Sequence, residues 1–185
     1  MSKALICAVA VVTLTAGARL SAQVPVNADA KVLADFGDRV KQYAALRDKV
    51  DGGAAKQTQT DDPAKLVAQK KALATNIQQV RAGAKPGDIF TPDVQPLIRR
   101  LLKPAMKGPD GADNSKAIKE EKPVVPLRVN VPYPEKEPLS MVPPDVLKQL
   151  PPLPKDLEYR FVTKHLILYD ARANLIVDVL PNAIP

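Results

Sequence analysis

The sequence predicts an α+β fold, in which amphipathic helices come first, a proline-rich extended strap follows, and a small antiparallel β-meander ends the chain. Three observations support this. Apolar residues recur every three or four positions in the first half of the chain, which is the spacing of one helix face. Ten prolines fall within residues 123–154 and disfavour both helix and central strand. Residues 158–180 are rich in β-branched and aromatic side chains, as strands are.

Residues 1–22 have the pattern of a cleavable secretory signal peptide. A positive charge at Lys3 precedes thirteen residues, 4–16, that carry no charged side chain. As a helix this run would span about 20 Å, whereas a transmembrane helix must cross roughly 30 Å of hydrocarbon. We therefore expect export to the periplasm or the extracellular space, with no retained transmembrane helix.

Cleavage is expected between Ala22 and Gln23, with Ala18 and Arg19 as the second choice, because small residues precede both points. The single cysteine of the chain, Cys7, would leave with the leader. A cysteine-free mature chain excludes disulfide bonds, thiolate metal sites and a cysteine nucleophile, so its stability must come from burial.

Positive charge is concentrated in the first half of the mature chain. The full sequence carries a net charge of +7, and loss of Lys3 and Arg19 lowers it to +5. Residues 23–109 contribute +6, and residues 110–185 contribute −1. A cationic surface is thus expected on the part that precedes the strap.

Two long amphipathic helices are predicted first. One covers residues 28–50, with Asn27 as its N-cap and a pair of glycines behind it. The other begins at Pro63, directly after the capping residue Asp62, and runs to about residue 82. Proline is tolerated at a first helical position because the N–H that it lacks would have no partner there.

A third helix is predicted after Thr91, and Pro96 is expected to kink or delay it. Together the three helices make a helical region over residues 23–106. We expect the first two to pack as an antiparallel hairpin and the third to close over them.

Residues 107–154 are predicted as a flexible and proline-rich linker or strap. The part up to residue 122 is polar and reads as a mobile linker. The prolines that follow favour an extended backbone. Within it, residues 127–131 alternate like a short edge strand, and residues 145–150 fit a turn of helix.

The C-terminal region, residues 155–185, is predicted to form a three-stranded antiparallel meander from residues 158–163, 165–169 and 175–180. The last two strands carry apolar residues on both faces. Three strands alone are marginally stable, so we expect other parts of the chain to cover this sheet, the amphipathic helices above all.

Candidate catalytic groups are sparse. The only histidine, His165, stands at the head of a predicted strand, and Asp170, Asp178 and Glu158 are the acids near it in sequence. Residues 165 and 170 differ in parity and should point to opposite faces, so a solvated strand-end histidine is the favoured interpretation. No nucleophile turn, phosphate loop or second zinc ligand accompanies it, and no cofactor or metal is predicted.

Arg99, Arg100, Lys103 and Lys107 form a basic cluster at the end of the predicted third helix. Outside the cytoplasm such a patch would meet an anionic envelope polymer, lipid headgroups or an acidic protein. Nucleic acid is not expected as a partner, because the mature chain has no tryptophan and few other aromatic residues for stacking. The alternative is a solvated face with favourable charge at a helix C-terminus.

The closing stretch LEYRFVTKHLILYDARANLIVDVLPNAIP, together with GDIFTP at residues 87–92, resembles a group of uncharacterised exported bacterial proteins. The resemblance covers about half of the mature chain. It implies no activity, ligand or catalytic residue.

Three functional hypotheses follow. The leading one is a non-enzymatic exported protein that binds a partner or serves a structural role in the cell envelope, with the basic cluster as its contact surface. The second is a secreted hydrolase that uses His165 and nearby acids. The third is a subunit whose apolar sheet is completed by another chain.

Overall fold

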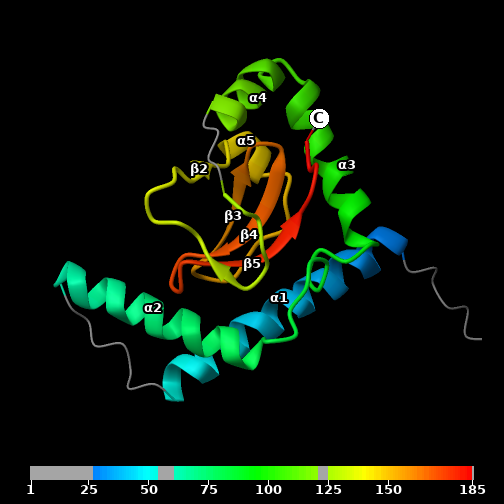
Figure 1. The fold of residues 1–185 in the computed structure, drawn as a ribbon. Coiled ribbons are helices and arrows are strands. Elements are labelled where there is room, and N and C mark those ends of the chain that lie inside the picture. Colours follow the sequence, from blue (N-terminus) through cyan, green and yellow to red (C-terminus); the bar gives the residue numbers. More distant parts are fainter. Residues whose placement is uncertain (1–26, 54–60, 121–124, 185) are drawn as a thin grey trace, which may run out of the picture.

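The computed structural model describes residues 27–53, 61–120 and 125–184, and it confirms the α+β fold (Figure 1). The helices are α1 (Ala28–Gly53), α2 (Pro63–Val80), α3 (Val94–Lys107), α4 (Gly111–Glu120) and α5 (Pro144–Leu147). The strands are β1 (Val131–Pro132), β2 (Ser140–Met141), β3 (Leu157–Val162), β4 (His165–Asp170) and β5 (Leu175–Leu180). They form one antiparallel sheet in the order β1-β5-β4-β3-β2.

The first two helices begin where the capping residues predict. The side chain of Asn27 accepts a hydrogen bond from the backbone N–H of Asp29, and that of Asp62 accepts one from Ala64. Helices α1 and α2 contact each other and run in opposite directions along one side of the sheet (Figure 1). In α2 the residues that face the core are Leu73, Ala74 and Ile77.

Helix α3 begins two residues after Pro92, slightly later than the start signal at Thr91 and Pro92 indicates. It begins at Val94, so Pro96 falls in the first turn, where backbone N–H groups have no intrahelical partner and a missing donor costs little. A second proline, Pro104, lies further inside the helix. The buried face of α3 consists of Val94, Leu97, Ile98 and Leu102.

The polar stretch after α3, expected as a mobile linker, instead contains helix α4. Ile118 is fully buried beneath it, and the Asn114 side chain donates a hydrogen bond to the carbonyl oxygen of Ala105 at 3.0 Å. Gly111 is required at the start of α4, because a Cβ there would stand 2.5 Å from the carbonyl oxygen of Met106. One apolar side chain, one side-chain hydrogen bond and one close backbone approach therefore dock this polar helix.

The three predicted strands of the meander are confirmed as β3, β4 and β5, and two-residue strands extend the sheet at each edge. Of the strand expected over residues 127–131, only the last residue is in a strand, as the first residue of β1. The expected helical turn over residues 145–150 forms slightly earlier, as α5. Prolines on both sides keep these elements short.

The sheet separates two apolar layers. Leu166 and Leu168 of β4 point toward the helices and belong to the larger core, as expected. Ile167 and Tyr169 point to the other face, which is covered by residues 125–139 of the strap. Both faces of the sheet are thus covered from within the chain.

A β-bulge in β5 turns one carboxylate toward the helical side. Leu168 pairs with Asp178 and Tyr169 pairs with Ile176, which leaves Val177 as the extra residue. The fully buried Asp178 then accepts backbone N–H groups from residues 87, 89 and 90 at 3.0, 2.7 and 2.8 Å. These hydrogen bonds fix the segment of residues 87–92 to strand β5.

No helix in the described ranges is long and apolar enough to span a membrane. The predicted signal peptide and its cleavage point between Ala22 and Gln23 lie outside the described residues.

Candidate functional site

The candidate site is a groove along the C-terminal half of α3. Leu102 faces the core, whereas Arg99, Lys103 and Lys107 lie four residues apart and therefore form one stripe along the helix. Like charges at this spacing repel each other by about 0.2–0.5 kcal/mol per pair. Lys107 lies in the last turn, where the helix dipole favours a cation by about 0.3–1 kcal/mol, so helix stability neither requires nor excludes the stripe.

The opposite wall of the groove is the segment after β5. The carbonyl oxygen of Lys164, in the β3–β4 turn, accepts the backbone N–H groups of Ala183 at 2.9 Å and Ile184 at 3.3 Å. Arg99 holds the same segment from the other side, through hydrogen bonds to the carbonyl oxygens of Pro181 at 2.8 Å and Asn182 at 3.1 Å. These contacts place the turn and the helix face to face.

The groove has a volume of about 410 Å³, which is within the roughly 300–1,000 Å³ of small-ligand sites. Its floor is apolar and its rim is cationic. The lining side chains are those of Arg99, Leu102, Lys103, Met106, Lys107, Lys164, Asn182, Ala183 and Ile184. Four of these carry positive charge, and none carries negative charge.

Three of the four cations are unneutralised. Lys103, Lys107 and Lys164 are exposed, and none of them forms an ion pair with any residue that the structure describes. Arg99 is half-buried, and its N–H groups donate hydrogen bonds to the carbonyl oxygens of Pro181 and Asn182 and to the side chain of Gln95. The lysines are therefore the groups that can meet an anion, and Arg99 positions the wall.

The predicted basic cluster is brought together only in part. Arg99, Lys103 and Lys107 line the groove, but Arg100 points away and pairs with Asp29 of α1 at 2.5 Å. Lys164 completes the site and was not predicted. No local signal in the sequence could have found it, because it joins α3 only through the hydrogen bonds of residues 183 and 184.

His165 lies next to the groove without lining it. Its Nδ1 atom accepts the backbone N–H of Asn182 at 3.2 Å, and partial burial together with the charge of Lys164 lowers the pKa of the ring. The acids near it in sequence are occupied elsewhere. Glu158 pairs with Arg160, and Asp178 binds the residue 87–90 loop.

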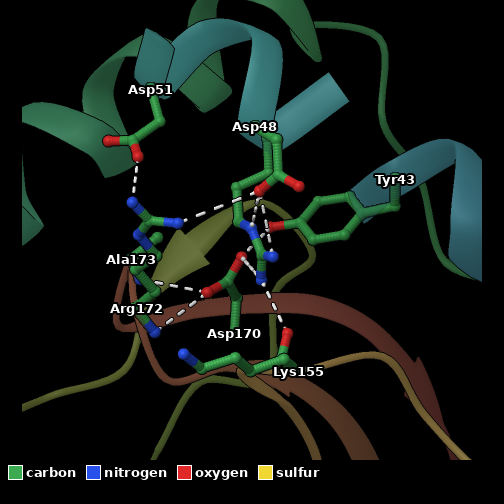
Figure 2. A network of polar contacts seen from close by, with 8 residues as sticks. Tyr43, Asp48, Asp51, Lys155, Asp170, Arg172 and Ala173 are labelled. Atoms are coloured by element: carbon green, nitrogen blue, oxygen red, sulfur yellow. Dashed lines mark hydrogen bonds and ion pairs between the residues drawn. The ribbon is translucent and has the colours of Figure 1, made fainter. Parts of the chain in front are cut away.

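The remaining acid, Asp170, belongs to a separate polar cluster at the other end of β4 (Figure 2). Its carboxylate accepts the Tyr43 hydroxyl at 2.8 Å and the backbone N–H groups of Arg172 and Ala173, while Arg47 lies 3.7 Å away. Burial raises the pKa of Asp170, whereas the Tyr43 hydrogen bond and the Arg47 charge act in the opposite direction. His165 and the acids thus do not meet in one pocket.

No protein family matches the chain, and neither the curated proteins nor the solved structures contain a match to it. The resemblance to exported bacterial proteins therefore stays a prediction. The structure adds that the two segments that carry the resemblance contact each other through Asp178.

A second hollow, of about 520 Å³, lies between α5, β3 and the residues that connect them. Met141 and Leu147 line it and are 77% and 48% exposed. Its charged side chains are balanced, since Lys148 pairs with Asp145 and the Glu158 carboxylate neutralises the one arginine at its wall. In contrast to those of the α3 groove, the positive charges of this hollow have acid partners.

Proposed function

We propose that the protein is exported and acts without catalysis, by binding an anionic partner of the cell envelope in the α3 groove. The observation that carries this proposal is the concentration of unneutralised positive charge on one concave surface. Lys103, Lys107 and Lys164 converge there from two elements that are distant in sequence. Unpaired like charges gathered on one concave surface raise the local positive potential and so attract an anion.

Cations elsewhere in the described residues show the contrast. Lys31 of α1, Lys148 after α5 and Arg172 in the β4–β5 turn each have an aspartate partner. Arg100, one position along α3 from the stripe, has one as well. Other exposed lysines, such as Lys49 and Lys136, form no ion pair with the described residues either, so what distinguishes the groove is that three unpaired lysines line one concave surface without an acid.

The groove chemistry fits an envelope partner better than a nucleic acid. Its lining contains no aromatic side chain for base stacking. Anionic wall polymers, lipid headgroups and acidic proteins are the anions that an exported protein meets. A hydrolase that uses His165 has less support, because the nearby carboxylates face other partners.

The proposal is tested with the mature form, residues 23–185, by co-sedimentation with isolated cell-wall sacculi and with vesicles that contain one quarter phosphatidylglycerol. We expect binding at low salt that falls steeply above physiological ionic strength, because the Debye length shrinks from about 8 Å at 0.15 M to about 3 Å at 1 M. Neutral phosphatidylcholine vesicles serve as the reference.

Two double variants with equal loss of charge make the test specific. Lys103→Gln with Lys107→Gln removes two groove charges, whereas Lys49→Gln with Lys136→Gln removes two exposed charges far from it. We expect about a tenfold weaker association for the groove variant alone, since each exposed charge contributes roughly 0.2–1 kcal/mol. Equal effects of the two variants, or binding that salt does not weaken, would contradict the proposal.

A further inference from the structure

We infer that the ligand of the α3 groove is a single-chain anionic amphiphile, bound as a monomer, whose acyl chain lies on the apolar floor and whose carboxylate or phosphate head lies among the lysines. This inference rests on the proposed function and names the chemical class of the partner. It is carried by the apolar surface inside the groove, chiefly that of Met106, which a purely anionic polymer would leave unused.

The groove offers apolar surface on the side chain of Met106 and on the aliphatic stems of its lysines. Leu102 and Ile184 close the bottom of the groove, but at 1% and 2% exposure they present almost no surface of their own. Met106 is half-buried beside them, and its flexible thioether can adapt to a bound chain. Each methylene that leaves water on such a surface tightens binding by up to about fourfold.

The charges are placed at the edge of this floor. Lys103 and Lys107 extend from the helix wall, and Lys164 extends from the turn opposite. Because long lysine side chains keep their ammonium groups in water, an anionic head would be held at the mouth while the chain lies below. This polarity matches an amphiphile and gives no advantage to a neutral apolar ligand.

A bilayer surface fits the groove less well than a free amphiphile. Membrane-bound surfaces present protruding apolar side chains to the lipid. The exposed large apolar residues among the described residues are Leu66, Val67, Val80, Met141 and Leu147, none of which lines the groove. The apolar floor lies below a rim of lysines, so a single chain can reach it more readily than a planar layer of lipids.

The volume limits the ligand to one chain. The groove measures about 410 Å³ and is open to solvent on one side, which suits part of one acyl chain rather than the paired chains of a bilayer lipid. Charge complementarity and size therefore point to the same class of molecule.

The test is calorimetric titration of residues 23–185 with octanoate, decanoate and dodecanoate below their micelle concentrations, and with dodecyl phosphate as the second head. We expect the dissociation constant to fall about twofold to fourfold for each added methylene, according to how much of it leaves water. Dodecyl maltoside, which has the same chain and no charge, should bind at least tenfold more weakly. Acetate and inorganic phosphate should not bind measurably.

Variants separate the floor from the rim. Met106→Gln should weaken dodecanoate binding severalfold more than it weakens sacculus binding, whereas Met141→Gln, on an exposed methionine of β2, should alter neither. Lys103→Gln with Lys107→Gln should weaken both. A ligand series without chain-length dependence, or tighter binding of phosphatidylglycerol vesicles than of dodecanoate, would overturn this inference. If the inference fails in this way but sacculus binding is still weakened by salt, the proposed function stands. If salt-sensitive sacculus binding is absent as well, both the proposed function and this inference are wrong.

Discussion

The carboxylate of Asp178 accepts the backbone N–H of Phe90 at 2.8 Å, although 88 residues separate the two along the chain. The same oxygen accepts the N–H of Ile89, and the other accepts those of Gly87 and Val179. Gly87 has a φ of 91°, a backbone conformation that glycine adopts without strain. This carboxylate therefore sets the position of the loop that leads into α3, and with it one wall of the groove.

Asp178→Asn is expected to lower the free energy of unfolding by about 2–4 kcal/mol, because an amide nitrogen cannot accept the two N–H groups that one carboxylate oxygen now receives. Urea denaturation of the mature form measures this. The exposed acid Asp110, changed to asparagine, is the matched control and should stay within about 0.5 kcal/mol of the wild type. Equal stability of the Asp178 variant would show that the loop is held by other contacts.

Arg81 supports the bulge from the helical side. Its guanidinium donates to the carbonyl oxygen of Val177 at 3.3 and 3.4 Å and stands 5.0 Å from the centre of the Tyr43 ring. Arg81→Met should cost about 1–3 kcal/mol of stability, since the carbonyl loses its donor and the ring loses its cation. Arg128→Met, at an exposed position of the strap, should be nearly neutral in the same thermal or urea unfolding experiment.

The raised pKa of Asp170 should make the free energy of unfolding depend on pH. Burial raises its pKa in the folded state above the ordinary value of about 4, so the folded protein binds more protons than the unfolded chain between these two pKa values. Its contribution to stability is then present at low pH and is lost as the pH rises through the folded-state pKa.

The measurement is the difference in unfolding free energy between the wild type and Asp170→Asn across a pH series. Taking the difference removes the titration of acids that both proteins share. It should fall as the pH rises from about 4, with a slope of at most about 1.4 kcal/mol per pH unit. A difference that rises with pH would mean that the Tyr43 hydrogen bond and the Arg47 charge outweigh burial.

Export predicts a defined mass. The protein recovered from the envelope or the medium of its host should lack residues 1–22 and begin at Gln23, as read by intact-mass spectrometry. We expect this cleavage because residues 4–16, as a helix, would span about 20 Å, less than the roughly 30 Å that a transmembrane helix must cross. Protein that still carries residues before Arg19 would contradict export by a cleaved signal peptide.

The first three helices and the main strands could be predicted because each has a signal in its own local sequence. Asp62 and Pro63 mark the start of α2 by their own chemistry, and the runs that became β3 to β5 have strand composition. Helix α4 could not be predicted, because its burial depends mainly on Ile118 and on a hydrogen bond from Asn114 to another helix. Such contacts are set by tertiary packing and leave little trace in periodicity.

The candidate site, like the fold, was predicted only in its local part. The stripe on α3 follows from the four-residue spacing of Arg99, Lys103 and Lys107, which is visible in the sequence. Arg100 points away from the groove because it pairs with Asp29 of α1. Lys164 lines the groove because the turn after β3 binds the segment that follows β5. Neither Asp29 nor this turn is near α3 in the sequence. Sequence reasoning found the helix wall of the groove and missed the wall opposite.

The most direct test of the groove as the binding site uses its own methionine. In the mature form labelled with ¹³C at the methionine methyl groups, Met106 reports on the groove floor, and Met141, which is 77% exposed on β2, reports on a different surface. Titration with dodecanoate should shift the Met106 methyl signal in a saturable manner and leave that of Met141 unchanged. A shift of Met141 alone, or equal shifts of both signals, would contradict binding in the α3 groove.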